Sequence, residues 1–74
     1  MILVIGLARP AESYVLARRL KPSEYRILND SDAVTIALDG RDPRETEVVY
    51  VAGAPDVLSE EAHVRLSMFM AGAR

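Results

Sequence analysis

The 74-residue sequence predicts a single α/β domain in which a short parallel sheet lies between helices. Two apolar blocks, Ile2–Ile5 and residues 48–52, support this prediction because they do not alternate with polar residues. Unbroken apolar blocks are typical of strands that are covered on both faces. Breakers and helical patterns separate the blocks, and a chain of this length has room for one domain with a thin core.

The first strand is expected over Ile2–Ile5, and its apolar character predicts a central place in the sheet. Gly6 ends this strand. A helix is expected over residues 10–20, because Pro10 suits a first helical turn and the residue before Pro22 avoids the helical region. At about 100° per residue, one broad face of this helix should lie on the sheet. That face contains Ser13, Tyr14, Leu16, Ala17 and Leu20.

A second strand is expected over Tyr25–Leu28, and the residues after it support two interpretations. Residues 33–38 alternate in the manner of a strand, which would pair with the next strand as a hairpin. Alternatively, Asp30 or Ser31 caps a short helix that Gly40 ends. The helix is preferred because it keeps strands and helices alternating along the chain.

A third strand is expected over residues 46–52, after a charged loop at 41–45. The last helix should begin after Ser59, an N-cap residue followed by two glutamates, and run to about Gly72. The predicted fold is therefore a minimal three-layer Rossmann-like β-α-β-α-β-α domain spanning residues 1–74. Its short sheet should be parallel, with right-handed crossovers and helices on both faces.

Composition narrows the classes of function. The chain has no cysteine and one histidine, His63, so neither a disulfide nor a metal site is expected. The formal net charge of -2 argues against nucleic-acid binding. The apolar runs are too short to cross a membrane, and Ile2–Ile5 lacks the flanks of a signal peptide. We expect a cytoplasmic protein.

Several segments together resemble a known group of proteins. The segment Ile2-Leu3-Val4-Ile5-Gly6 with Arg9, the helix end Ala17-Arg18-Arg19-Leu20 and the strand Val48-Val49-Tyr50-Val51 resemble the small Rossmann-like proteins of unknown function encoded by actinobacterial phages. This resemblance covers most of the chain. It implies the strand–helix alternation and a place in the host cytoplasm, and it supplies no catalytic residues.

The turn after the first strand is a candidate anion-binding site. In doubly wound folds this turn holds phosphates, because backbone N–H groups and a helix N-terminus point toward it. Gly6 and Arg9 are the candidate residues, but the turn has neither the second glycine nor the lysine of the known phosphate-binding motifs. No cofactor is expected, and a small-ligand or nucleotide-binding domain that uses residues 6–10 is the alternative function.

Acidic residues and His63 lie near the start of the last helix, where acid–base or metal chemistry is conceivable. Asp56, Glu60 and Glu61 are better explained as acids that favour a helix N-terminus. Asn29, Asp30 and Asp32 are likewise better explained by capping than by binding a ribose. We predict no catalytic residues and no enzyme activity.

The last helix carries two apolar stripes. One stripe, suited to the core, contains Leu66, Phe69, Met70 and Ala73. Val64, Met68 and Ala71 lie nearly opposite, and a helix that is apolar on both sides is normally covered on both sides. We therefore predict a non-enzymatic protein–protein interaction module that self-associates through Val64, Met68 and Ala71, most simply as a two-fold dimer. A host or cellular protein is the further partner expected.

Overall fold

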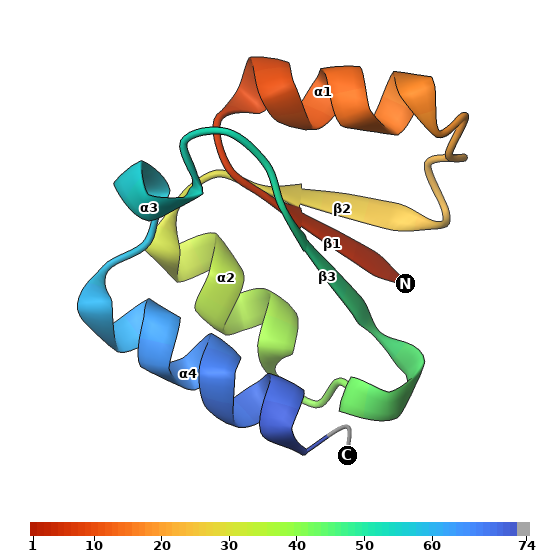
Figure 1. Cartoon of the computed structure of the whole chain (residues 1–74). Coiled ribbons are helices and arrows are strands. Elements are labelled where there is room, and N and C mark those ends of the chain that lie inside the picture. Colours follow the sequence, from red (N-terminus) through yellow and green to blue (C-terminus); the bar gives the residue numbers. More distant parts are fainter. Residues whose placement is uncertain (73–74) are drawn as a thin grey trace.

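The computed structural model describes residues 1–72 and has three layers (Figure 1). The strands are β1 (Ile2–Ile5), β2 (Tyr25–Leu28) and β3 (Glu47–Tyr50), and the helices are α1 (Ala8–Ala17), α2 (Ser31–Leu38), α3 (Ala54–Val57) and α4 (Glu60–Ala71). Within these residues the strands form one parallel sheet in the order β2-β1-β3. The predicted fold class and the central place of β1 are confirmed.

The sheet separates two hydrophobic clusters. Helix α1 covers one face, and α2 and α4 cover the other (Figure 1). The smaller cluster, beneath α1, has Val4, Ala11 and Val15 as its buried members. The larger cluster, beneath α2 and α4, is built from Leu3, Ile5, Leu28, Val34, Ala37, Ala54, Ala62 and Leu66. Successive residues of β1 supply both clusters, because side chains of a strand alternate between the two faces.

The two apolar strands differ in their burial. Leu3, Val4 and Ile5 of β1 are fully buried. In β3, Val48 and Val49 are half-buried and Tyr50 is exposed, although the sequence there is equally apolar. The difference follows from the strand order, since β3 has a neighbour on only one side. The third strand is also shorter than the expected residues 46–52, because Thr46, Val51 and Ala52 lie outside it.

Helix α1 starts earlier and ends earlier than residues 10–20. Its end is a Schellman motif, in which the N–H of Leu20 donates to Val15 O and the N–H of Arg19 donates to Leu16 O. Arg19 has a φ of 53°, the left-handed conformation that glycine normally occupies at this position. The backbone therefore turns out of the helix before Pro22 can end it.

The predicted core face of α1 is wrong. Ala11 and Val15 are its buried residues, whereas Leu16, which was assigned to the core, is 77% exposed. Tyr14 and Leu20 are half-buried and pack against the smaller cluster. The small Ala11 side chain lets the helix approach the sheet closely, so the buried stripe is centred on Ala11 and Val15 rather than on the larger Leu16.

Residues 31–38 form helix α2, so the preferred interpretation of the ambiguous segment is confirmed. Its N-cap is Asp30, whose Oδ1 accepts a hydrogen bond of 2.7 Å from the N–H of Ala33. Two short elements were not predicted. They are a 3₁₀ turn, η1 (Pro43–Glu45), and α3, which lies between the third strand and the last helix.

Helix α4 begins and ends where the sequence indicated. Ser59 Oγ accepts a hydrogen bond of 3.1 Å from the N–H of Ala62, and Gly72 is the C-cap. Of the predicted core stripe, Leu66 is fully buried and Phe69 is half-buried, but Met70 is exposed. Ala73 lies outside the described residues.

Candidate functional site

The turn between β1 and α1 has already used some of its hydrogen-bond donors. The N–H of Gly6 donates to Leu28 O, and the N–H of Leu7 donates to Ala52 O. Pro10 has no N–H to offer. Arg9 is exposed at the start of α1. The turn is thus hydrogen-bonded to the end of β2 and to the turn after β3, and fewer of its N–H groups can face an anion than in a phosphate-binding loop.

The turns that follow β1 and β3 pack directly against each other. A Cβ atom on Gly6 would collide with the side chain of Val51, and one on Gly53 would collide with Leu7. Both glycines have positive φ angles, 155° and 83°. In this fold the crevice between these turns is the usual ligand site. Here the crevice is narrowed by Leu7 and Val51, so the glycines serve close packing between the turns.

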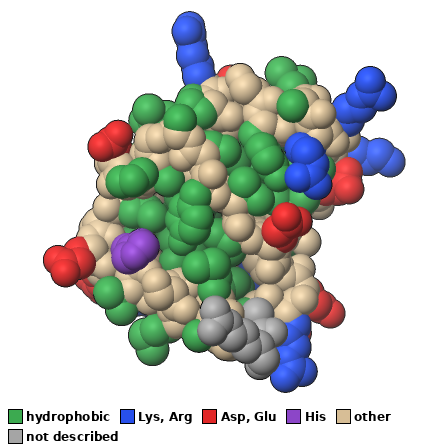
Figure 2. Space-filling view, in the orientation of Figure 1, with side chains coloured by type: hydrophobic (Ala, Val, Ile, Leu, Met, Phe, Trp, Pro, Cys, Tyr) green, Lys and Arg blue, Asp and Glu red, His purple; other side chains and the backbone are tan. Residues whose placement is uncertain are grey.

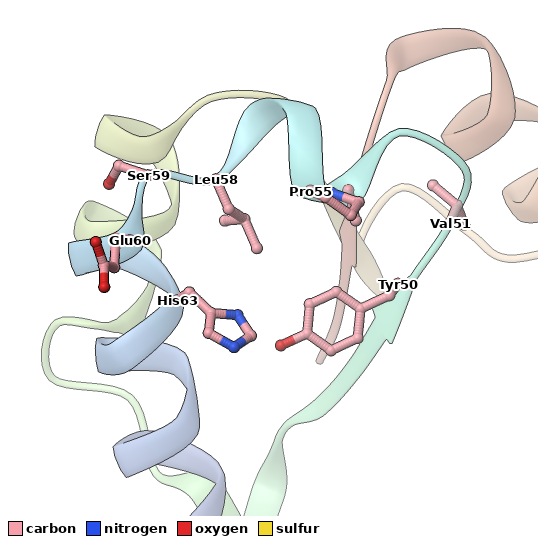
Figure 3. Close-up of a pocket in the computed structure, with 8 residues that line it drawn as sticks. Tyr50, Val51, Pro55, Leu58, Ser59, Glu60 and His63 are labelled. Atoms are coloured by element: carbon pink, nitrogen blue, oxygen red, sulfur yellow. The ribbon is translucent and has the colours of Figure 1, made fainter.

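An open apolar hollow of about 480 Å³ lies at the end of β3 and shares Val51 with that crevice. Residues from β3, from α3 and from the start of α4 line it, chiefly Tyr50, Pro55, Leu58 and His63. The imidazole of His63 and the hydroxyl end of Tyr50 point toward each other across the hollow (Figure 3). The sequence groups His63 with acidic residues and does not single out Tyr50. Only the position of β3 beside α4 brings the two together.

Four polar side chains line this hollow, those of Tyr50, Ser59, Glu60 and His63. Ser59 is occupied as the N-cap of α4, and the carboxylate of Glu60 points away from Tyr50 (Figure 3). Burial raises the pKa of the Tyr50 hydroxyl above its ordinary value of 10.0, so the phenol is neutral and a weak acid at physiological pH. One imidazole and one neutral phenol on an apolar wall are better suited to holding a partner than to activating a nucleophile.

The outer surface of α2 and α4 is a second apolar region, which we call the α2–α4 face. We define it by Ile36, Val64, Met68 and Ala71. Met68 is 71% exposed, Ile36 is 70% exposed and Val64 is 51% exposed. Ile36 and Met68 line the same groove between the two helices, and Leu38 and Phe69 line it as well. Among the predicted contact residues of α4, Met68 therefore adjoins an exposed isoleucine that the sequence did not single out.

The remaining candidate residues either have structural roles or do not come together in one site. Asp30 caps α2, which supports the capping explanation. Arg18 donates to Tyr14 Oη and Arg41 donates to Ala37 O, so both guanidinium groups bind within the chain. Among residues 1–72, no three His, Asp or Glu side chains gather in a way that could hold a metal ion. No helix in the same range is long and apolar enough to cross a membrane.

These features define a small Rossmann-like α/β protein whose sheet has an exposed edge strand and whose outer helices are apolar. In comparisons with known proteins, no family model, no curated protein and no solved structure matches the chain. The resemblance to the phage-encoded proteins therefore remains a hypothesis. The observations that bear on function are therefore the exposed surfaces of the chain.

Proposed function

We propose that the protein is a non-enzymatic interaction module that self-associates through the α2–α4 face. The observation that carries this proposal is the pair Ile36 and Met68, two large apolar side chains that are each about 70% exposed on the same groove. The hydrophobic core does not use Ile36 or Met68, because the inner sides of α2 and α4 already contribute other apolar residues to it. These are Val34, Ala37, Ala62 and Leu66.

The energetics favour covering this face. Burial of apolar surface contributes roughly 25 cal/mol per Å², and a domain of this size has little core from which to gain stability. A two-fold axis would set α4 against α4 of a second copy, so that the same side chains meet. Alanine allows a close approach of the helices, and methionine adapts its shape to a partner surface. The salt bridge described between Glu61 and Arg65 of α4 is solvent-exposed, and Arg65 also lines the groove beside Met68, so this charged pair would lie at the border of the contact.

The chemistry of the described residues supports a binding role over catalysis. The hollow beside β3 offers His63 and Tyr50 without a positioned nucleophile. In the β1–α1 turn, the N–H groups of Gly6 and Leu7 already donate to Leu28 O and Ala52 O. Gly6 also packs closely against Val51. The same apolar face would also suit a host or cellular protein, which is the further partner that the sequence predicts.

Sedimentation equilibrium tests the proposal. The wild-type protein at several hundred micromolar should have a weight-average mass above that of one chain, and Met68→Glu should lower it. Placing a charge in an apolar contact costs several kcal/mol, so the dissociation constant should rise at least about tenfold. Leu16→Glu is the matched control, because Leu16 is 77% exposed on the opposite layer. A monomeric wild type, or an equal effect of the two variants, would overturn the proposal.

A further inference from the structure

The outer edge of β3 has unpaired backbone groups. The N–H of Glu47 donates to Met1 O and the N–H of Val51 donates to Ile5 O, so these residues point toward β1. Backbone groups alternate in direction along a parallel strand, which means that the N–H and C=O of Val48 and Tyr50 point to the opposite side. In the order β2-β1-β3 no strand of the described chain lies there.

The β3 edge also lacks the features that usually prevent edge strands from pairing. Charged residues, prolines and bulges commonly protect such edges. The other edge strand, β2, has Arg26 in its middle and follows Lys21 and Pro22. Residues 47–52 contain one charge, at Glu47, and no proline. Because Pro43, Arg44 and Glu45 precede β3 much as Lys21 and Pro22 precede β2, the two edges differ in the strands themselves. The one charge of β2 lies in its middle, whereas that of β3 is at its first residue, which leaves Val48, Val49 and Tyr50 as an apolar edge.

The surface beside this edge is apolar as well. In Figure 2, hydrophobic side chains gather next to His63, the purple residue, and continue across the middle of the face where Figure 1 places β3. Tyr50 is 44% exposed at this position, and it lines the hollow together with Leu58 and Pro55. A strand added at the edge would cover part of this hollow.

We propose that β3 pairs with β3 of a second copy across a two-fold axis, which makes one six-stranded sheet of two chains. A two-fold axis at this edge sets the strands antiparallel. With the axis at Val49, Val48 faces Tyr50 of the other chain and Tyr50 faces Val48. All the outward-pointing N–H and C=O groups of both residues then form hydrogen bonds.

The side chains that would face each other favour this register, and they favour a second copy of the chain as the partner of the β3 edge. The pair of Val48 with Tyr50 combines a β-branched with an aromatic residue, which is a favourable cross-strand combination. Glu47 faces Val51 of the other chain, so the two Glu47 carboxylates lie about 13 Å apart, four residues along the strand. β3 can therefore pair with itself without placing like charges opposite each other. This contact is separate from the α2–α4 face and extends self-association to a second surface.

Engineered cysteines test the register, because the chain has none of its own. Val49 would face Val49 of the second copy as a pair without hydrogen bonds, at a Cα separation of about 4.5 Å. That separation lies within the range of disulfides, whereas position 47 is too far from its own copy. Under mild oxidation, Val49→Cys should form disulfide dimers at least about tenfold faster than Glu47→Cys. Collision alone would favour Glu47→Cys, since Glu47 is more exposed.

Two measures keep this result interpretable. Each cysteine variant is combined with Met68→Glu, so that crosslinking does not depend on α4. A mixture of Glu47→Cys and Val51→Cys should give mainly the mixed disulfide by mass spectrometry, since these positions face each other. This second measurement decides the question if Val49→Cys fails to fold. Equal crosslinking rates, or a statistical mixture of disulfides, would overturn the pairing of β3 and leave the proposal for the α2–α4 face to its own test.

Discussion

Leu66 and Leu16 provide a matched pair of substitutions that tests how the helices pack. Leu66 of α4 is fully buried in the larger cluster, whereas Leu16 of α1 is 77% exposed. Leu66→Ala should cost about 3 kcal/mol, from lost burial and from the cavity that remains. Leu16→Ala should change the stability by less than about 0.5 kcal/mol, because an exposed helical site loses little packing and alanine favours the helix.

The cost at Leu66 is large for this protein. At roughly 0.05–0.15 kcal/mol per residue, a domain of 74 residues has a free energy of unfolding of about 4–11 kcal/mol. A loss of 3 kcal/mol lowers the ratio of folded to unfolded protein by more than about 100-fold. With a urea dependence near 1 kcal/mol per molar, the midpoint should fall by about 3 M.

Urea titration followed by circular dichroism measures both variants. The protein should be at a few micromolar, so that self-association does not add stability. A loss for Leu16→Ala that equals or exceeds the loss for Leu66→Ala would refute this packing, and it would restore Leu16 to the core face that the sequence pattern indicated.

Three further perturbations follow from particular contacts. Arg19→Gly should raise the free energy of unfolding by about 0.5–1 kcal/mol in urea titration, because Arg19 occupies the left-handed position of a Schellman motif; a loss of stability would contradict this role. Ser31→Ala should cost about 1–2 kcal/mol in the same assay, since Ser31 Oγ donates to Val57 O and accepts from the N–H of Ser59, which ties α2 to the start of α4; an unchanged urea midpoint would show that these bonds are dispensable. Burial raises the pKa of the Tyr50 hydroxyl, so its contribution to stability is present below about pH 10 and is lost as the pH rises through the folded-state pKa. The wild type should therefore lose more stability than Tyr50→Phe between about pH 9 and pH 11, and parallel losses would show that Tyr50 titrates like an unfolded tyrosine.

Local signals in the sequence were sufficient for much of the fold. The unbroken apolar run of β1 predicts a strand covered on both faces, and Leu3, Val4 and Ile5 are fully buried. The capping residues Asp30 and Ser59 mark the starts of α2 and α4, because each side chain satisfies a free N–H of its helix. These features depend on neighbours within a few residues along the chain.

Features that depend on distant parts of the chain could not be predicted in this way. The apolar run of β3 resembles that of β1, but the strand order leaves β3 at an edge, where Tyr50 meets His63 of α4. The buried face of α1 depends on how closely Ala11 can approach the sheet. The spacing of apolar residues along the helix does not reveal this distance. Ile36 became part of a candidate contact only because α2 packs beside α4.

We propose that the α2–α4 face binds a second copy of the chain. A dilution series of ¹⁵N–¹H NMR spectra reports on this contact residue by residue. As the protein is diluted from several hundred to about ten micromolar, a range that spans weak self-association, amide signals of Ile36, Val64, Met68 and Ala71 should shift together along one binding curve. Signals of the exposed side of α1 around Leu16 should stay fixed. Spectra that do not change with concentration, or shifts confined to the turn at Gly6 and Arg9, would contradict the claim.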